Sequence, residues 1–292
     1  MSPHLVTEKT FIVDGLCLAA KLWGDYSGLP VIALHGWLDN AASFDCIAEQ
    51  LPNLQILAID LPGHGLSDHK PASGNYAIWD DLRSIVGVAD QMGWQEFALL
   101  GHSRGANIAT LLSGALPQRV SHLVCLDGLI PQPEKSESFP VQMGRYLRDF
   151  TTTPLIGGEK GHATFDAAVA ARCKATPMLS SAAALIVARG LTQAEDGRFY
   201  WRSDKRLKLA SPVKLSLQQL QASIDAIIAP AMFVSAKQCL GQWLPTLDIK
   251  IDNRFEIREI EGQHHCHMEA QATQIAEWIS EFLSRADGKR EA

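Results

Sequence analysis

Residues 97–108 read FALLGHSRGANI, an apolar run that passes without a break into a serine flanked by glycines. Residues 97–100 predict a buried strand, and residues 106–116 predict a buried helix that Pro117 would stop. The intervening G-x-S-x-G pattern is typical of a sharp turn that lifts Ser103 above the carboxyl edge of a sheet. This context predicts that Ser103 is a catalytic nucleophile. The alternative is a glycine-rich helix start that Ser103 only caps.

Strand and helix patterns alternate on both sides of this turn. The predicted buried strands cover residues 31–34, 56–59, 120–126, 231–235 and 255–260, and the predicted helices cover residues 43–51, 78–92, 217–228 and 269–283. Near the start, residues 11–13 and 16–22 flank Asp14-Gly15, a favoured two-residue hairpin turn. The alternation indicates βαβ units and a mostly parallel sheet that begins with an antiparallel pair.

Residues 130–211 interrupt the alternation. This segment contains several prolines and glycines, helical stretches near residues 165–173 and 181–189, and no convincing strand. We therefore expect a helical cap at residues 130–211, inserted after the sixth strand. The α/β core would then consist of residues 1–129 and 212–292.

A serine hydroxyl is a weak nucleophile near neutral pH and needs a neighbouring base. His264 follows the last predicted strand and leads into the final helix, which places it at the same sheet edge as Ser103. The run HHCH (264–267) could also be interpreted as a metal site, but contiguous ligands lack the usual spacing for one tetrahedral ion. We expect no metal, and we expect His265 and His267 to pack or to line a pocket.

The segment HGW (35–37) follows the first buried parallel strand, and its glycine permits a close approach of a substrate. The backbone N–H groups of Trp37 and Arg104 are the predicted donors to a developing oxyanion. Simple pocket lining is the alternative for Trp37. We expect His102 to be a packed residue of the turn and His64 to fix its own loop by a hydrogen bond.

Four segments together resemble the α/β-hydrolase superfamily over nearly the whole chain: LHGWLDN (34–40), DLPGHGLS (60–67), GHSRG (101–105) and GQH (262–264). Three further segments resemble its serine-hydrolase-like group: LDG (126–128), WRSDKRL (201–207) and SPV (211–213). The resemblance implies an α/β-hydrolase fold, with an eight-stranded, mostly parallel sheet flanked by helices, a helical cap and a cofactor-free hydrolytic site. It does not fix a substrate, because this fold supports many chemistries.

The sequence departs from many of these relatives at the acid of the catalytic triad. They carry it just after the seventh strand, where this chain reads VSAKQCL (234–240) without a carboxylate. Asp127 ends the sixth strand, which should neighbour the nucleophile strand, so we predict that Asp127 reaches His264. The alternative is that Asp127 only forms a turn with Gly128 at the entry to the cap. The other candidate acids are Asp225, Asp248 and Asp252.

Composition excludes several classes of partner. The net charge of -6 contains no long run of like charges, which argues against a nucleic-acid surface and favours a small-molecule partner. No window approaches 18 uninterrupted apolar residues, and the N-terminus has no apolar export segment, so we expect neither a membrane span nor export. Six cysteines without CxxC spacing favour reduced thiols and a cytoplasmic location.

The sequence thus predicts hydrolysis of a small carboxylic ester through an acyl-enzyme on Ser103, with His264 as base and then acid. Thioester or C–C bond hydrolysis by the same triad is the nearest alternative. A non-catalytic ligand-binding protein with this fold is another. Ser103 argues against haloalkane dehalogenases and epoxide hydrolases, which use aspartate as the nucleophile. The sequence predicts neither the physiological substrate nor the oligomeric state.

Overall fold

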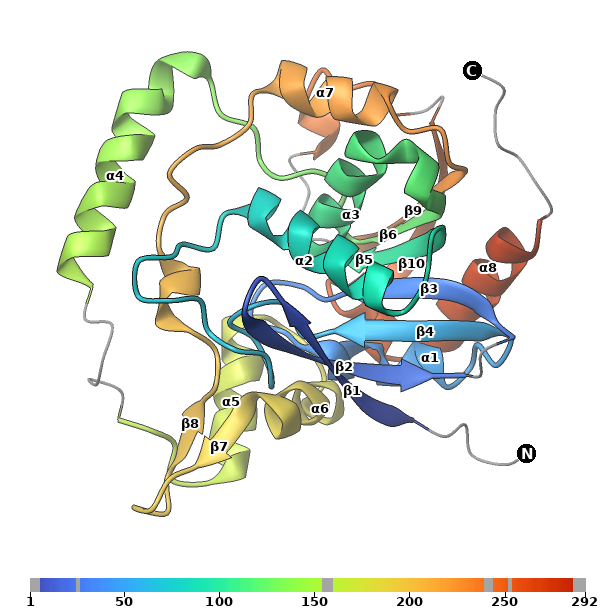
Figure 1. The fold of residues 1–292 in the computed structure, drawn as a ribbon. Helices are drawn as coiled ribbons and strands as arrows, with labels where there is room; N and C mark the ends of the chain where they lie inside the picture. The colour runs from blue at the N-terminus through green and yellow to red at the C-terminus, as the bar shows by residue number, and fades with distance from the viewer. Residues whose placement is uncertain (1–5, 25–26, 154–159, 239–243, 252–253, 286–292) are drawn as a thin grey trace.

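The structure, a computed structural model, describes residues 6–24, 27–153, 160–238, 244–251 and 254–285. One sheet of eight strands runs in the order β1-β2-β4-β3-β5-β6-β9-β10 (Figure 1). The strands are β1 (Thr7–Val13), β2 (Leu16–Trp23), β3 (Leu29–Leu34), β4 (Leu54–Ile59), β5 (Phe97–His102), β6 (Val120–Leu126), β9 (Ala231–Gln238) and β10 (Phe255–Gln263). Neighbours from β4 to β10 are parallel, whereas β1–β2 and β2–β4 are antiparallel. The predicted mostly parallel sheet is confirmed.

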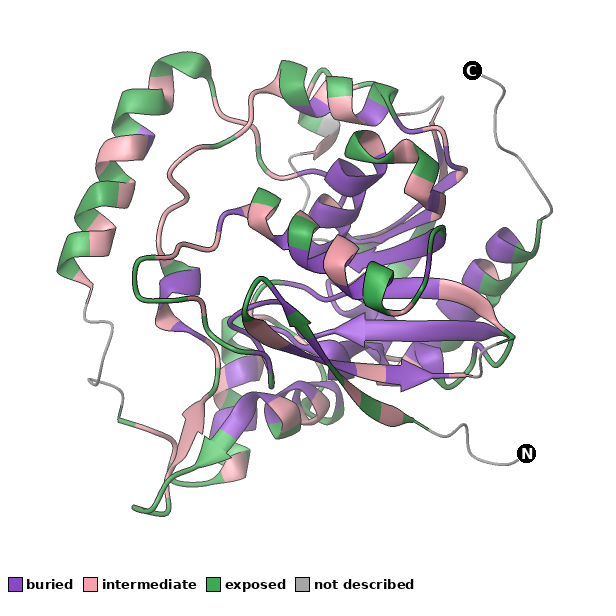
Figure 2. Cartoon of the chain, viewed as in Figure 1, coloured by how far each residue is buried: buried purple, intermediate pink, exposed green. Residues whose placement is uncertain are grey.

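Two apolar cores lie on opposite faces of this sheet. In β3, Ile32 and Leu34 join one core, whereas Val31 and Ala33 join the other, as the alternation of side chains along a strand requires. Because both faces are covered, β4 and β5 are buried throughout, and β3 is buried from Val31 to Leu34 (purple in Figure 2). The helices on the first face are α2 (Ile78–Gln91), α3 (Arg104–Ala115) and α7 (Leu217–Asp225), and those on the second are α1 (Asp45–Ala48) and α8 (Ala272–Ser284).

The prediction of one α-helix over residues 43–51 is wrong. The chain instead makes a 3₁₀ turn, η1 (Ala41–Phe44), followed by the single turn α1. The side-chain oxygen of Asn40 accepts a hydrogen bond from the Ala42 N–H at 3.1 Å and so starts the turn earlier. The other 3₁₀ segments are η2 (Pro117–Arg119), η3 (Ser136–Ser138), η4 (Lys205–Lys208), η5 (Leu244–Thr246) and η6 (Cys266–Met268).

Between β6 and α7 the chain leaves the sheet and forms a mostly helical segment. Its elements are α4 (Phe139–Thr152), α5 (Phe165–Ala175), α6 (Ser180–Gly190) and a short hairpin of β7 (Leu191–Gln193) and β8 (Phe199–Trp201). The expectation of no strand here is wrong, because strands of three residues are too short to produce a recognisable alternation. Helix α4 is not among the expected helical stretches, because its sequence contains Pro140 and Gly144. The limits of the cap at residues 130 and 211 stay a prediction.

The carboxyl ends of β3, β5, β6 and β10 lie at one edge of the sheet. Leu34 is in register with Gly101, and His102 is in register with Leu126. The residues that follow these strands therefore meet at this edge. They are Trp37, Ser103, Asp127 and His264.

Two other sequence expectations concern membranes and cysteines. No helix in the described ranges is long and apolar enough to cross a membrane. Five cysteines of the described ranges are free thiols, namely Cys17, Cys46, Cys125, Cys173 and Cys266. The sixth, Cys239, lies outside the described residues.

Candidate active site

Ser103 lies between β5 and α3 with φ 52° and ψ −117°, a conformation that few non-glycine residues adopt. A Cβ on Gly105 would lie 1.9 Å from the Leu34 carbonyl oxygen, and a Cβ on Gly101 would lie 2.4 Å from the Cα of Ala106. The turn therefore needs both glycines. A strained serine on such a turn is typical of an exposed nucleophile.

His264 and Asp127 meet beside this turn. The Nδ1 of His264 lies 2.5 Å from Oδ2 of Asp127, and both residues are buried. The other carboxylate oxygen of Asp127, Oδ1, accepts a hydrogen bond from the Ala236 N–H at 3.0 Å. Because Nδ1–H donates to the carboxylate, Nε2 of His264 is left free to accept a proton.

The other candidate acids do not share this position. Asp225 accepts a hydrogen bond from Gln221 within α7 at 2.9 Å. Asp248 is exposed in the segment that enters β10 at the edge opposite to His264. Asp252 lies outside the described residues. Asp127 is therefore the candidate that the fold brings to the histidine.

Trp37 and Arg104 lie on the two segments that the sequence predicts to flank the oxyanion. Arg104 is the first residue of α3, so its N–H has no partner within the helix. Its guanidinium pairs with Asp81 at 2.7 Å. The indole Nε1 of Trp37 donates to the Leu207 carbonyl at 2.9 Å and so ties the loop after β3 to the cap. The role of these two N–H groups stays a prediction.

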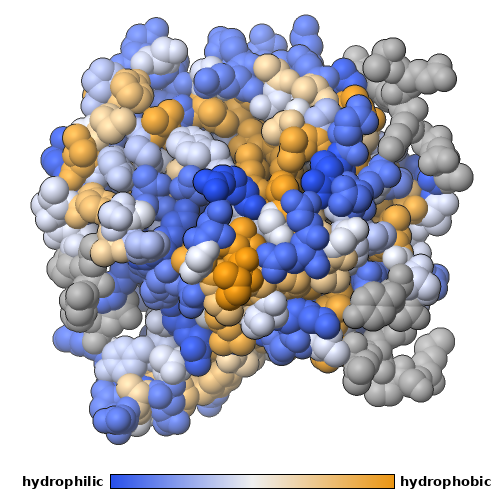
Figure 3. Space-filling model, in the orientation of Figure 1, coloured by the Kyte–Doolittle hydropathy of each residue, from blue (hydrophilic) through white to orange (hydrophobic). Residues whose placement is uncertain are grey.

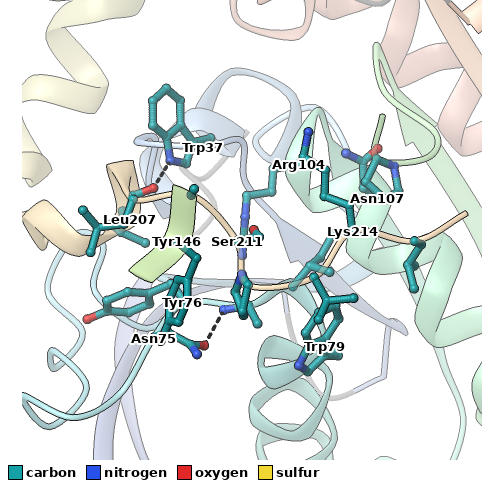
Figure 4. Close-up of a pocket in the computed structure, with 18 of the residues that line it drawn as sticks. Trp37, Asn75, Tyr76, Trp79, Arg104, Asn107, Tyr146, Leu207, Ser211 and Lys214 are labelled. Carbon is teal, nitrogen blue, oxygen red and sulfur yellow. Dashed lines mark hydrogen bonds between the residues drawn. The ribbon is translucent and has the colours of Figure 1, made fainter. Parts of the chain in front are cut away.

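A cavity of about 280 Å³ opens beside Trp37 and Arg104, between the core and residues 206–215 (Figure 4). Aromatic side chains form much of its wall, namely Trp37, Tyr76, Trp79 and Tyr146. In the space-filling view, apolar side chains gather near the middle of the face shown, with polar side chains around them (Figure 3). Polar side chains, among them Asn75, Gln132 and Lys214, share this wall, so the cavity suits a small organic ligand that carries polar groups. Ser103 and His264 are not among its lining residues.

Five other histidines of the described chain are buried near the site, namely His35, His64, His102, His265 and His267. Burial lowers the pKa of each imidazole below its ordinary value, and the pKa values of His64 and His267 lie well below it. His64 donates from Nδ1 to the Pro62 carbonyl at 3.1 Å, which confirms its predicted loop-fixing hydrogen bond. These rings are therefore neutral in the folded protein near pH 7.

We expect the free energy of unfolding to fall as the pH is lowered below about 6.5. In this range the histidines of the unfolded chain become protonated, whereas the buried rings of the folded protein stay neutral. Each such histidine contributes up to about 1.4 kcal/mol per pH unit, until its own lowered pKa is reached. Denaturant titrations at several pH values measure this slope. His267→Leu should make the slope shallower by up to that amount, because it removes one fully buried imidazole. An identical slope in the variant and the wild type would contradict this explanation.

The histidines of the run 264–267 do not together form a cluster with the spacing of metal ligands. Among the described residues such a cluster consists of Asp39, His102 and His265, whose ligand atoms lie within 4.8 Å of one another. The guanidinium of Arg172 already contacts Asp39 at 2.5 Å. The negative charge of the Asp39 carboxylate is thus compensated by Arg172.

Sequence reasoning missed part of this arrangement. His102 is buried as expected, but its Nε2–H also donates to the carbonyl of His264 at 2.9 Å. Asp39 is not among the sequence candidates, although it lies only two residues after Trp37. Arg172 comes from the cap helix α5, and no sequence signal connects it with the core.

Comparisons with known proteins agree with the fold. A family model described as alpha/beta hydrolase fold matches residues 30–209. The "Serine hydrolase-like protein" of Danio rerio is 29% identical over 279 residues, which cover 91% of this chain and 85% of that protein. The crystal structure of the selenomethionine-substituted hypothetical protein PA1622 from Pseudomonas aeruginosa PAO1 is 35% identical, with a TM-score of 0.88, and covers 95% of this chain and 99% of that chain. The thioesterase domain from the curacin biosynthetic pathway, at 22% identity and a TM-score of 0.80, shares the fold over 94% of this chain and 99% of its own.

Proposed function

The chain belongs to the α/β-hydrolase family, and from this premise we propose that it hydrolyses a small carboxylic ester through an acyl-enzyme on Ser103. The observation that carries the proposal is the 2.5 Å contact between His264 Nδ1 and Asp127 Oδ2, next to a serine in a strained turn. A histidine oriented in this way is a suitable base for a serine hydroxyl.

In the proposed reaction, the Ser103 hydroxyl oxygen attacks the ester carbonyl carbon while Nε2 of His264 takes its proton. Asp127 stabilises the imidazolium that forms. The N–H groups of Trp37 and Arg104 donate to the oxyanion. Collapse of this intermediate breaks the bond to the alcohol, which leaves with the proton from His264. Water then attacks the acyl group, and His264 takes and returns a proton to release the acid and restore the serine.

The proposal is tested with p-nitrophenyl esters of graded acyl length beside thioesters of the same lengths. We expect kcat/KM to rise by up to about fourfold for each added methylene while the chain still fits, because burial of one methylene contributes about 0.8 kcal/mol. It should fall once a cavity of about 280 Å³ is filled.

Two outcomes would change the proposed class of function. A kcat/KM more than about tenfold higher for thioesters than for matched esters would change the substrate class. The curacin-pathway thioesterase domain, which has a similar fold, makes that comparison necessary. No turnover of any ester or thioester, together with no labelling by a fluorophosphonate probe, would favour a ligand-binding protein.

The cap should set the accepted acyl length, because residues of the expected cap line the cavity. Tyr146 of α4 is one of them, and Tyr146→Ala enlarges that wall. We expect the ratio of kcat/KM for long over short esters to rise by about tenfold. The matched control is Leu147→Ala in the same helix, since Leu147 is 56% exposed and does not line the cavity. An unchanged ratio in Tyr146→Ala would contradict a role of the cap in specificity.

A further inference from the structure

Among the described residues, the loop formed by residues 35–40, which carries Trp37, is hydrogen-bonded to the helical segment between β6 and α7 at three points. Each hydrogen bond joins one residue of the loop to one residue of that segment: Trp37 Nε1 to the Leu207 carbonyl (2.9 Å), Asn40 Nδ2 to the Ile186 carbonyl (2.7 Å) and Arg172 Nη2 to Asp39 Oδ1 (2.5 Å). The first two bonds use neutral groups. The third is an ion pair between two buried side chains.

Asp39 also contacts the two other loops of the proposed site. Its Oδ2 accepts a hydrogen bond from Nε2 of His265 at 3.1 Å and lies 3.6 Å from Nδ1 of His102. His265 directly follows His264, and His102 directly precedes Ser103. One carboxylate therefore touches the chain neighbours of both the proposed base and the proposed nucleophile.

The ring of His102 connects these loops to each other. Its Nε2–H donates to the carbonyl of His264 at 2.9 Å, and the two ring centroids lie 4.7 Å apart. A neutral imidazole has one N–H, so Nδ1 of His102 carries a lone pair on the side of Asp39. A Cβ on Gly36 would lie 2.7 Å from Asp39 Oδ2 and 3.0 Å from His102 Nδ1, so the loop packs directly on this pair.

The charge of this cluster depends on Arg172. Burial by itself would raise the pKa of Asp39, but the hydrogen bond from His265 and the charge of Arg172 hold that pKa well below its ordinary range. Burial lowers the pKa values of His102 and His265, so both are neutral near pH 7. Arg172 is then the cation that compensates the carboxylate, and its removal leaves a buried charge without a partner.

A divalent cation is the other ligand that Asp39, His102 and His265 could share. Nη2 of Arg172 lies 2.5 Å from Asp39 and 3.4 Å from Nε2 of His265. A metal ion at this position would therefore lie close to a guanidinium in a buried site, and two positive charges so close together are electrostatically unfavourable. The geometry favours the arginine as the resident cation.

We propose that Arg172 is a positioning residue supplied by the cap, which acts through Asp39 to fix the 35–40 loop, the Ser103 turn and the His264 loop relative to one another. The inference rests on the proposed function, because it assigns a task to residues around that site. Catalytic competence then requires the cap to be seated on the core. Small displacements of reacting groups are costly, since a shift of about 1 Å reduces a rate by about 10²-fold.

The test compares Arg172→Met, which keeps an unbranched apolar stem without the charge, with Arg172→Lys, which keeps the charge. We expect Arg172→Met to lower kcat and the rate of fluorophosphonate labelling by about 10²-fold with KM nearly unchanged. Arg172→Lys should recover part of this loss, and millimolar guanidinium should partly rescue Arg172→Ala.

The matched control is Arg189→Met. Arg189 also lies in a helix of this segment and pairs with a buried core carboxylate, Asp60, at 2.8 Å, but it does not touch Asp39. Arg189→Met should lower Tm but reduce kcat much less than Arg172→Met does. An equal loss of kcat in both variants, or wild-type kcat in Arg172→Met, would overturn the proposal.

If Arg172→Met does not fold, Asp39→Asn replaces it, because it breaks the same ion pair from the other side. Wild-type kcat in Asp39→Asn would overturn the proposal, and the loss described for Arg172→Met would support it. Stoichiometric zinc bound by wild type but not by His265→Gln would also overturn it. A wild-type protein that neither labels nor turns over esters would instead refute the proposed function.

Discussion

Asp127→Asn is expected to keep the fold and to lower kcat by about 10⁴. The amide oxygen of asparagine can still accept from the Ala236 N–H, as Oδ1 of the aspartate does at 3.0 Å. Its NH₂ group then faces Nδ1 of His264 and donates to it. The imidazole must therefore carry its proton on Nε2, where it cannot act as a base. Steady-state kinetics on the best ester, with circular dichroism and Tm, measure both parts of the prediction.

Asp225→Asn and Asp248→Asn are the controls, because both remove a carboxylate that the sequence also offers as the acid. Each should leave kcat within about threefold of wild type, as is usual for changes outside a catalytic site. A loss below tenfold in Asp127→Asn, together with a collapse in Asp248→Asn, would move the acid to the segment before β10.

Ser103→Ala is expected to abolish fluorophosphonate labelling and to lower kcat by about 10⁶. An activated serine attacks the phosphorus of the probe and stays bound to it, whereas alanine has no atom to form that bond. The positive φ at this position strains alanine and serine alike, so the variant should fold. Labelling followed by mass spectrometry of the modified peptide gives the result directly.

Ser113→Ala provides a matched control. Ser113 is a buried serine of α3 that donates to the Ala109 carbonyl, so its loss tests the effect of an ordinary serine in the same helix. It should label at the wild-type rate. Wild-type protein that folds and cleaves esters without becoming labelled would refute the assignment of Ser103.

The features predicted best from the sequence are the buried strands, which are apolar runs, and the residues that directly follow them. The apolar runs at 97–100 and 120–126 fall within β5 and β6, and parallel strands bring the residues after them to one edge. This is why Ser103, Asp127 and His264 can be placed together from sequence alone. The three-residue strands β7 and β8 and the capped turn at Ala41–Phe44 depend on local hydrogen bonds that periodicity does not reveal.

The contact between Arg172 and Asp39 could not be predicted for a different reason. The two residues are 133 positions apart and belong to segments whose mutual placement depends on the docking of α5. Neither side chain stands out in its own segment. Only the packed structure shows that both are buried and that they neutralise each other.

The position of Asp127 on β6 has a consequence for biosynthesis. The strands β1 to β6 form a contiguous part of the sheet, so they can associate as soon as they leave the ribosome. The other edge of β6 pairs with β9, and the N–H of Asp127 donates to the Val234 carbonyl. Because β9 follows the cap in the sequence, this edge of β6 stays unpaired until the cap and β9 have been translated. During that interval the nascent chain exposes a strand edge that is open to association with other chains. The carboxylate of Asp127, the proposed triad acid, thus receives its partners only when the last two strands arrive, and we expect a truncated translation product to be inactive.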